Sequence, residues 1–505
     1  MSAQPDIDTD LFAERYAKGE PQLVWTELVA DLETPVSALL KLAADERHSI
    51  LLESVEGGAV RGRYSILAFA PDLIWRCHGD QAEINRNARH DAETFDPMSE
   101  PGLDALAAIL AESRIDIPPE LPPMAAGLFG YFGYDIVRQI ETLPDSNPDE
   151  IGIPDAVYIR PTITAVFDNV ADKVTLVTPV WPDPSVGAEA AYAAGQARLD
   201  DTVSRFDRGV PRTASVPAGS EVELALTSNR SQSEYHAMVE QAKEYIRAGE
   251  IFQVVPSQRF TVPFDLPPAA LYRSLRRLNP SPFLFVLNVG DFALVGSSPE
   301  ILVRLRDDTV TVRPIAGTRP RGANPAEDEA LAEDLLADPK ELAEHLMLLD
   351  LGRNDVGRVA EIGSVKVTEE FVIERYSHVM HIVSNVQGEA KPGVDAIKAL
   401  SAGFPAGTVS GAPKIRAMEI IDELEPVRRS FYAGAVGYFA ADGSMDTCIT
   451  LRTALIKDQK MYIQAGGGVV ADSDPEAEYQ ESRNKAGALI RAAEQAHRFI
   501  NQTEH

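Results

Sequence analysis

Apolar stretches typical of β-strands follow one another at hairpin spacing along this chain of 505 residues. Residues 162–168 (TITAVFD) and 173–180 (KVTLVTPV) are separated only by the turn-like segment 169–172, which indicates a hairpin. Four further strand-like stretches (IFQVVPSQRF, FLFVLNV, FALVGS and EILVRL) lie between residues 251 and 305. Parallel strands would need a long crossover between neighbours, whereas hairpin spacing gives antiparallel pairs. The spacing therefore predicts an α+β fold with largely antiparallel sheets and surrounding helices.

Helical patterns interrupt these strands and suggest how the chain is organised. Thr34 and Pro35 predict a helix that runs to about residue 44, residues 187–207 are Ala-rich and helical, and a periodic stretch after residue 232 stops at Gly249. Residues 208–229 (RGVPRTASVPAGSEVELALTSN) collect Pro, Gly, Ser and Thr without periodicity, as linkers do. We therefore expect an N-terminal domain over 1–205, a linker over 206–228 and a second domain over 229–495.

The charge balance excludes several classes of partner. The chain has 47 Lys and Arg against 77 Asp and Glu, which gives a formal net charge of −30. Nucleic acids and anionic membrane surfaces recruit proteins through Lys and Arg, so neither is expected as a partner. A small anionic substrate is still allowed, but the protein must then build a local cationic site against its own field.

The cysteines and the apolar runs favour a soluble cytoplasmic protein. Cys77 and Cys448 are the only two cysteines, too few for a disulfide framework or a zinc knuckle. The first twenty residues contain no apolar core of signal-peptide length, and no run reaches the roughly 18 apolar residues of a membrane span.

Carboxylates at helical spacing are the first candidate site. In residues 338–355 (DPKELAEHLMLLDLGRND) three leucines mark one face of a helix and leave Glu341 and Glu344 side by side on another. Such a pair could hold a hard cation such as Mg²⁺ through its oxygens. Spacing alone fits a solvated acidic face better, because many other acids surround the pair.

A second helix carries a similar pattern near the C-terminal end. Asp474 and Pro475 predict its start, and Glu478, Glu481 and Lys485 then fall on one stripe. A surface ion pair between Glu481 and Lys485, worth about 0.2 to 0.5 kcal/mol, would account for that spacing without any function.

Three consecutive glycines precede this helix in QAGGGVVADSD. Glycines after a strand let backbone N–H groups approach an anion closely. The segment matches neither the P-loop nor the GxGxxG pattern, so nucleotide binding is not indicated.

Two isolated polar residues complete the candidates. Arg452 lies in the otherwise apolar stretch MDTCITLRTALI, where its planar fork could bind a ligand carboxylate or form an internal salt bridge. His381 in RYSHVMHIVSNV could point inward as a proton donor or acceptor, although a lone histidine is more often structural.

Taken together, collinear segments from about residue 50 to 490 resemble the chorismate-utilising enzymes, specifically the large subunit (component I) of anthranilate synthases. The matching segments are LLES, NPSPF, GSSPE, PIAGTRPRG, ELAEHLMLLDLGRND, RYSHVMHIVS, FPAGTVSGAPKIRAMEII, FYAGAVGY, DTCITLRTA and GGG followed by EYQESRNKA. The resemblance implies an N-terminal component I domain and a C-terminal chorismate-binding catalytic domain. It also implies amination of chorismate at C2 with loss of the C4 hydroxyl, then elimination of pyruvate to give anthranilate.

The resemblance assigns roles to individual residues of this chain. It implies that Glu344 and Glu481 are Mg²⁺ ligands, with Glu341 and Glu478 as partners that touch the ion directly or through water. It implies catalytic roles for His381, Glu341 and Thr408. The implied chorismate-binding residues are Gly317, Thr318, Tyr432, Arg452, Gly466, Gly467, Gly468 and Lys485.

Two positions discriminate among the reactions of the family. Ala316 stands where aminodeoxychorismate synthases carry a lysine that attacks C2, so ammonia itself must attack here. Gln253 stands where isochorismate and salicylate synthases carry a lysine that activates water, and a neutral amide is a poor base. Both residues favour anthranilate formation. Aminodeoxychorismate synthase and a non-catalytic tryptophan-binding homologue are the alternatives.

The source of ammonia and the regulation follow from other segments. Neither cysteine lies in a nucleophile turn of the amidotransferase kind, so we expect a separate glutamine amidotransferase subunit to supply ammonia. Ser54 in LLES, with Pro280, Ser281 and Pro282 in NPSPF, matches the tryptophan feedback site of the family, although NPSPF alone would fit a simple turn.

Overall fold

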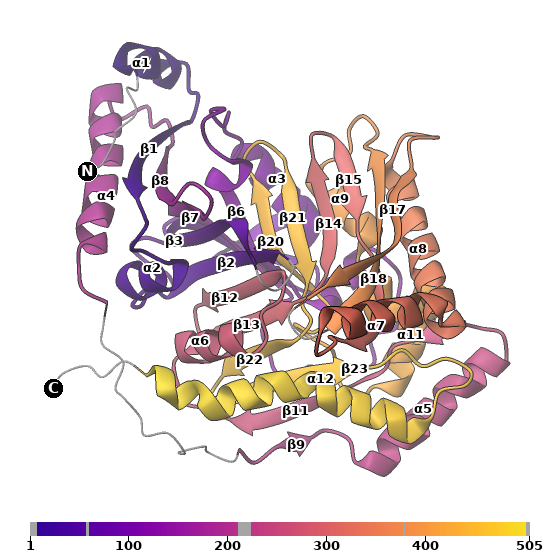
Figure 1. Cartoon of the computed structure of the whole chain (residues 1–505). Helices are drawn as coiled ribbons and strands as arrows, with labels where there is room; N and C mark the ends of the chain where they lie inside the picture. Colours follow the sequence, from indigo (N-terminus) through magenta and orange to yellow (C-terminus); the bar gives the residue numbers. More distant parts are fainter. Residues whose placement is uncertain (1–7, 57–59, 211–223, 377–378, 501–505) are drawn as a thin grey trace.

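The computed structural model describes residues 8–56, 60–210, 224–376 and 379–500 (Figure 1). Part of the linker expected over 206–228 therefore lies outside the described residues. Among the helices of the described ranges, none is long and apolar enough to cross a membrane.

Antiparallel pairing dominates the architecture. Every strand pair within the described residues is antiparallel, and 21 strands join one connected network, while β10 and β19 form a separate pair. The strands are β1 Gln22–Val29, β2 His48–Glu56, β3 Val60–His78, β4 Gln81–Asn85, β5 Asp96–Pro101, β6 Gly127–Phe132, β7 Ala156–Asp168, β8 Lys173–Val180, β9 Thr227–Ser228, β10 Gln253–Val254, β11 Ser257–Pro263, β12 Phe283–Val289, β13 Phe292–Ser298, β14 Ile301–Arg306, β15 Thr309–Val312, β16 Ile315–Pro320, β17 Lys366–Arg375, β18 Val379–Glu389, β19 Gly411–Ala412, β20 Ala435–Ala440, β21 Met445–Ile449, β22 Thr453–Lys457 and β23 Lys460–Gly466. The predicted α+β class with largely antiparallel sheets is confirmed.

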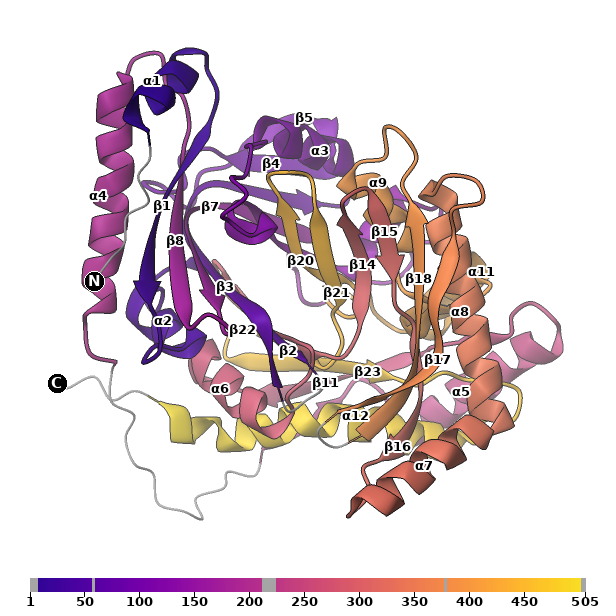
Figure 2. The ribbon, with the colours of Figure 1, turned by 45° about the horizontal axis from the view of Figure 1, so that its top comes forward.

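Helices surround these strands on the outside of the molecule (Figures 1 and 2). They are α1 Thr9–Ala17, α2 Pro35–Leu42, α3 Gly102–Glu112, α4 Ala188–Phe206, α5 Gln232–Arg247, α6 Pro268–Leu278, α7 Pro325–Ala337, α8 Pro339–Val359, α9 Ala396–Gly403, α10 Gly407–Ser410, α11 Lys414–Leu424 and α12 Pro475–Ala496, with 3₁₀ turns η1 Pro123–Ala125, η2 Tyr134–Gln139 and η3 His497–Phe499. Helix α4 packs on β8, α12 on β23, and α8 on β16 and β18. These contacts place α8 and α12 on the strands that carry the candidate site.

Local signals in the sequence located several elements correctly. Thr34 caps α2, and its hydroxyl accepts a hydrogen bond from the Ser37 amide in a capping box. Strands β7 and β8 form the expected hairpin. Helix α5 ends at Arg247, two residues before Gly249, whose φ of +77° lies in the left-handed region that suits glycine.

The two halves of the chain share one strand network. β2 pairs with β12 from the second half, and β6 pairs with β20. The two largest groups of buried apolar residues likewise mix both halves, with Trp75 and Phe439 in one and Leu51 and Leu489 in the other. Strand pairs on either side of the expected boundary near residue 228 therefore stabilise each other directly.

Candidate active site

Helix α8 carries the first pair of carboxylates. Asp338 caps the helix by accepting hydrogen bonds from the amides of Lys340 and Glu341, which fixes where the first turn begins. Glu341 and Glu344 lie three residues apart on this helix, as read from the sequence, but both are partly buried, whereas spacing alone favoured a solvated acidic face. The three-leucine face is not wholly buried, because Leu346 is 48% exposed and the buried stripe runs instead through His345, Leu348 and Leu349.

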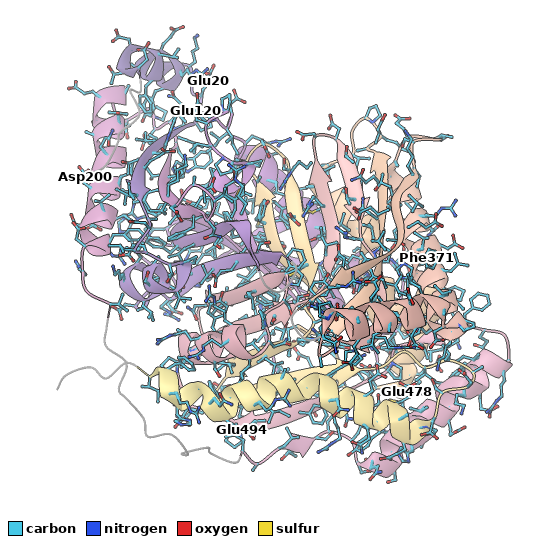
Figure 3. All side chains as sticks on the ribbon, viewed as in Figure 1. Glu20, Glu120, Asp200, Phe371, Glu478 and Glu494 are labelled. Carbon is cyan, nitrogen blue, oxygen red and sulfur yellow. The ribbon has the colours of Figure 1, made fainter. Side chains whose placement is uncertain are left out.

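Helix α12 carries the second set of candidate site residues. Its start at Pro475 with Asp474 as cap is as predicted, and Glu478, Glu481 and Lys485 follow on one stripe. Lys485 Nζ lies 2.8 Å from Glu481 Oε1 and 2.9 Å from the carbonyl of Gly466. The predicted ion pair is thus present, and its lysine also reaches the glycine segment. Glu478 is buried on this helix (Figure 3).

These four carboxylates converge with few cations between them. Burial raises the pKa of Glu344, and the nearby charges of Glu341 and Glu481 raise it further. Burial also raises the pKa of Glu478, with Glu481 adding to the effect. Among the described residues, the cations in ion-pair contact with the four carboxylates are Lys485, on Glu481, and Arg319, whose Nη1 lies 3.3 Å from Glu341 Oε1. The charges of Lys485 and Lys340 offset part of the rise in the pKa of Glu478 that burial causes.

The donor chemistry of this group fits Mg²⁺. Glu478 Oε2 is buried and has no hydrogen-bond partner, so one carboxylate oxygen is held out of water without compensation. Carboxylate oxygens crowded in this way are the ligands that Mg²⁺ takes, with water and substrate oxygens completing its shell. Within the described ranges, no three His, Cys, Asp or Glu side chains are close enough to coordinate an ion together, so an ion at this place would rest on one or two carboxylates directly and on water for the rest of its shell.

The glycine segment needs its glycines for close approach. A Cβ on Gly467 would come within 2.6 Å of Glu478 Oε2, and one on Gly468 within 2.2 Å of Gln253 Nε2. None of Gly466, Gly467 and Gly468 has a positive φ, so the segment is not the left-handed nest that an anion-binding glycine loop would form. The three residues instead bring the strand end against α12 and β10.

Gln253 connects the glycine segment to the carboxylates. Its Nε2 donates to Glu344 Oε1 at 3.1 Å, while its Oε1 is buried with no hydrogen-bond partner. That oxygen is available to accept a hydrogen bond from a ligand.

Arg452 differs from its predicted setting in one respect. It does not lie inside a strand but in the break between β21 and β22, with φ at +47°, a backbone conformation uncommon for residues other than glycine. Its guanidinium forms no ion pair with any described carboxylate, so the internal salt bridge considered above is absent from that part of the chain. Arg452 is therefore available for a ligand carboxylate.

His381 lies on β18 opposite Thr318 of β16. Its Nδ1 is 2.9 Å from the carbonyl of Gly317 and 3.1 Å from Thr318 Oγ1. Burial lowers the pKa of His381, so the ring is neutral at neutral pH. A carbonyl partner assigns the proton to Nδ1 and leaves Nε2 as an acceptor.

Glu300 is a site residue that the sequence reasoning missed, although it ends the segment GSSPE. Its side chain is buried, and Thr408 Oγ1 donates to its Oε1 at 3.2 Å. Burial raises the pKa of Glu300 to about 8, so the carboxyl is mostly protonated at neutral pH. A single acid following a proline at the start of an apolar strand was the available signal.

A continuous series of contacts brings the predicted residues together. The Tyr376 ring lies 5.6 Å from that of His381 and is close enough to Glu300 and Arg452 to share electrostatic interactions with them. A Cβ on Gly317 would lie 3.2 Å from Glu341, which links β16 to the carboxylates of α8. Tyr432 is buried, and burial raises the pKa of its hydroxyl to about 12, while the Gly466 backbone lies in hydrogen-bonding reach.

The residues predicted for tryptophan lie elsewhere. Ser54 on β2 faces Phe283 on β12, and both line a cavity of about 300 Å³ that also contacts Arg304, Tyr438 and Cys448. Pro280, Ser281 and Pro282 immediately precede Phe283 but do not line this cavity. None of the residues of the carboxylate site lines it either.

Comparison with known proteins identifies the relatives of this chain. It is 60% identical to the anthranilate synthase component 1 of Cereibacter sphaeroides over 97% of this chain and 98% of that protein, and 50% identical to the Pseudomonas aeruginosa protein of the same name over 94% and 96%. The crystal structure of anthranilate synthase component I from Streptococcus pneumoniae TIGR4 matches with a TM-score of 0.73 at 37% identity, covering 85% of this chain and 92% of that one. The menaquinone-specific isochorismate synthase of Escherichia coli shares the fold, with a TM-score of 0.69 at 19% identity over 96% of this chain and 98% of that one. Residues 64–491 match the chorismate binding enzyme family. The chain therefore belongs to the chorismate binding enzyme family.

Proposed function

We propose that this chain is the large subunit of an anthranilate synthase, a lyase that converts chorismate and ammonia to anthranilate, pyruvate and water. The relatives at 60% and 50% identity carry that name over nearly their whole lengths. One observation carries the proposal. The guanidinium of Arg452, which forms no ion pair with a described carboxylate, neutral His381 and the protonated carboxyl of Glu300 lie beside the carboxylates of α8 and α12.

Binding of chorismate would use the cationic and backbone groups of the site. The substrate is a dicarboxylate, which an acidic protein repels unless local cations receive it. Arg452 can bind one carboxylate with its planar fork, and Lys485 can bind the other, with single amides of Gly466, Gly467 and Gly468 as further donors, although these glycines form no nest. Tyr432, Gly317 and Thr318 would complete the chorismate-binding site.

Mg²⁺ would be held by Glu344 and Glu481, with Glu341 and Glu478 as further partners, and would supply a positive charge that binds the ring carboxylate and weakens the bond to the C4 hydroxyl. The uncompensated Glu478 oxygen and the raised pKa of Glu344 support this assignment. Glu341 is held in place by its ion pair with Arg319.

Proton transfers fall to Glu300 and His381. Because Glu300 is mostly protonated at neutral pH, it can give its proton to the departing C4 hydroxyl, which leaves as water, and Thr408 orients its carboxyl. Ammonia forms the new bond at C2, where the free amide oxygen of Gln253 can accept a hydrogen bond from it, and the resulting ammonium can return a proton to the Glu300 carboxylate. Neutral His381 can then take the proton from C2 as the enolpyruvyl group leaves and the ring becomes aromatic, and transfer of that proton to the enolate gives pyruvate.

The nitrogen source is expected to be a separate glutamine amidotransferase subunit. Both cysteines are buried, and burial raises the pKa of the Cys77 thiol to about 11 and that of Cys448 above its usual value. Thiols of this kind are poor nucleophiles, so neither suits glutamine hydrolysis. Their unpaired state also fits a reducing compartment such as the cytoplasm.

Feedback inhibition by tryptophan is proposed for the cavity lined by Ser54. Its volume of about 300 Å³ suits a single amino acid such as tryptophan, and the apolar side chain of Phe283 lines it together with the polar residues Glu53 and Arg304. Pro280, Ser281 and Pro282 would act by setting the position of Phe283.

The reaction can be tested with the purified chain. Chorismate with ammonium and Mg²⁺ should give anthranilate, followed by its fluorescence, whereas glutamine in place of ammonium should give none. An aminodeoxychorismate product would favour the alternative enzyme despite Ala316. Activity with glutamine would contradict the assignment of a separate amidotransferase, and undiminished activity in chelator would contradict the metal.

A further inference from the structure

Arg429 and Glu425 form an ion pair that is almost completely buried beside the site. The side chains are 1% and 3% exposed, and Arg429 Nη2 lies 2.7 Å from Glu425 Oε1. Arg429 Nε lies 3.0 Å from Glu425 Oε2, so two nitrogens on one edge of the guanidinium bind the two carboxylate oxygens. A buried pair of this quality is costly to assemble and seldom adds net stability over apolar residues of the same shape. Its presence calls for a role beyond stability.

The remaining donors of Arg429 bind the backbone of two segments that carry site residues. Nη1 donates to the carbonyl of Val409 at 2.6 Å, and Val409 directly follows Thr408. Nη2 donates to the carbonyl of Val255 at 2.5 Å, two residues after Gln253. One side chain therefore fixes the distance between the segments of Thr408 and Gln253.

The guanidinium also lies over two aromatic rings. Its central carbon is 5.4 Å from the ring centre of Tyr432 and 4.9 Å from that of Tyr134. Tyr432 is one of the residues proposed to bind chorismate, and Tyr134 comes from η2 in the first half of the chain. Cation–π contacts of this kind hold a ring in place when both groups are desolvated.

Glu425 extends the same network to the glycine segment. Its Oε1 accepts hydrogen bonds from the amide of Ser257 at 2.9 Å and from the Ser257 hydroxyl at 2.7 Å. Ser257 pairs with Gly466 across β11 and β23. The ion pair thus contacts, directly or through one residue, four separate segments that line the site, namely those of Gln253, Thr408, Tyr432 and Gly466.

We propose that Arg429 and Glu425 are a positioning pair that sets the relative placement of these four segments for the amination of chorismate. The proposal rests on the proposed function, because it concerns the geometry of that reaction. Neither side chain needs to touch the substrate. The pair acts by holding Gln253, Thr408 and Tyr432 at fixed distances, and misplacement of reacting groups by about 1 Å can cost about a hundredfold in rate.

Arg429→Lys is the direct test. Lysine keeps the charge but has one nitrogen, so it cannot hold Glu425 and two carbonyls in one plane. We expect kcat with ammonium to fall about a hundredfold while the KM for chorismate changes by less than about threefold. The positive charge that lysine keeps at this position should therefore not be enough to maintain kcat.

Arg160→Lys provides the matched control. Arg160 also binds a carboxylate through two nitrogens, at 2.8 and 3.2 Å from Asp72, and lies 4.2 Å from the centre of the Trp181 ring. It lies on β7 and contacts no residue of the proposed site. Its replacement should lower thermal stability and leave kcat within about twofold of the unmodified protein.

The outcomes separate the two proposals. If the unmodified chain makes no anthranilate, the proposed function fails. If the unmodified chain does make anthranilate, two results would show that the positioning role is wrong: Arg429→Lys has the same kcat as Arg160→Lys, or Arg429→Lys changes only the KM for chorismate. If Arg429→Lys does not fold, Ser257→Ala is the second variant, because it removes one hydrogen bond to Glu425. We expect its kcat to fall about threefold to tenfold at unchanged KM. An unchanged kcat in Ser257→Ala would overturn the proposal.

Discussion

Two groups of neighbouring carboxylates in this molecule differ in the cations that pair with them: arginines match the group around Arg429, whereas the group on α8 and α12 is only partly matched. Around Arg429, Glu425 is held by two nitrogens of the Arg429 guanidinium, and Asp135 is held by Arg138. On α8 and α12, four carboxylates share Lys485 and Arg319. Buried charges without partners are costly, and like charges raise each other's pKa values.

This contrast indicates different roles for the two regions. The paired region holds its segments in a fixed arrangement without any added ligand. The unpaired region carries an excess of negative charge that a bound cation would remove, which supports the proposed Mg²⁺ site. At the proposed site, part of the net charge of −30 would then help to bind an anion through a metal.

Removing a proposed metal ligand should have the largest effect. Glu344→Ala should lower kcat/KM for chorismate by about a thousandfold or more, because about 4 kcal/mol of transition-state stabilisation would be lost with the cation. Anthranilate fluorescence in excess Mg²⁺ measures it. Glu333→Gln, an exposed acid on the neighbouring helix α7, is the control and should retain activity. Full activity of Glu344→Ala would remove the metal site.

Neutralising one carboxylate in each region should change stability in opposite directions. Glu425→Gln leaves Arg429 buried without its partner and should lower the free energy of unfolding by about 3 to 5 kcal/mol. Glu344→Gln relieves repulsion from Glu341 and Glu481. Without Mg²⁺, this change should leave the free energy of unfolding unchanged or raise it by about 1 kcal/mol. Urea unfolding in chelator measures both, and equal losses would contradict the contrast between the regions.

The raised pKa of Glu300 should appear in the pH dependence of activity. If Glu300 acts as an acid, kcat/KM should fall about tenfold per pH unit above its pKa of about 8, and Glu300→Gln should abolish that limb. The sign for stability follows from linkage. The folded state keeps a proton that the unfolded state loses near pH 4.5, so this group's contribution to stability declines between pH 4.5 and about 8. A flat profile across pH 8 would contradict the role.

The smallest effect on catalysis is expected at the cavity of Ser54, which lies outside both regions. Ser54→Phe should fill part of the cavity and abolish inhibition by tryptophan, while kcat changes by less than about twofold because no site residue lines that cavity. Rates measured across a tryptophan titration test this. Unchanged inhibition would place the regulatory site elsewhere.

Much of the fold was predictable because its signals are local. The Thr34 cap, the hairpin of β7 and β8 and the end of α5 depend on neighbouring residues. The pairing of β2 with β12 and of β6 with β20 was not predicted, because it joins residues far apart in the chain and no local pattern specifies it. The apolar stretches 63–70 and 72–77 are interrupted by Pro71 in the sequence, yet both belong to the single strand β3, whose register shifts between Pro71 and Leu73.

The site divides in the same way. Helical spacing predicted that Glu341 and Glu344 share a face, and the start of α12 was read correctly from Asp474 and Pro475. The raised pKa of Glu300 was hidden, because burial depends on the tertiary fold. Arg452 looked like part of a strand because its neighbours are apolar, and only the structure shows its left-handed backbone.

The stability of the chain with and without Mg²⁺ tests the central claim most directly. An ion that binds only the folded state raises the free energy of unfolding in proportion to the logarithm of its concentration above Kd. Urea unfolding in millimolar Mg²⁺ should therefore require more denaturant than in chelator for the unmodified chain, and Glu344→Gln should show no such shift. Equal unfolding of the unmodified chain in both solutions, or an equal shift in Glu344→Gln, would show that the crowded carboxylates do not bind the metal.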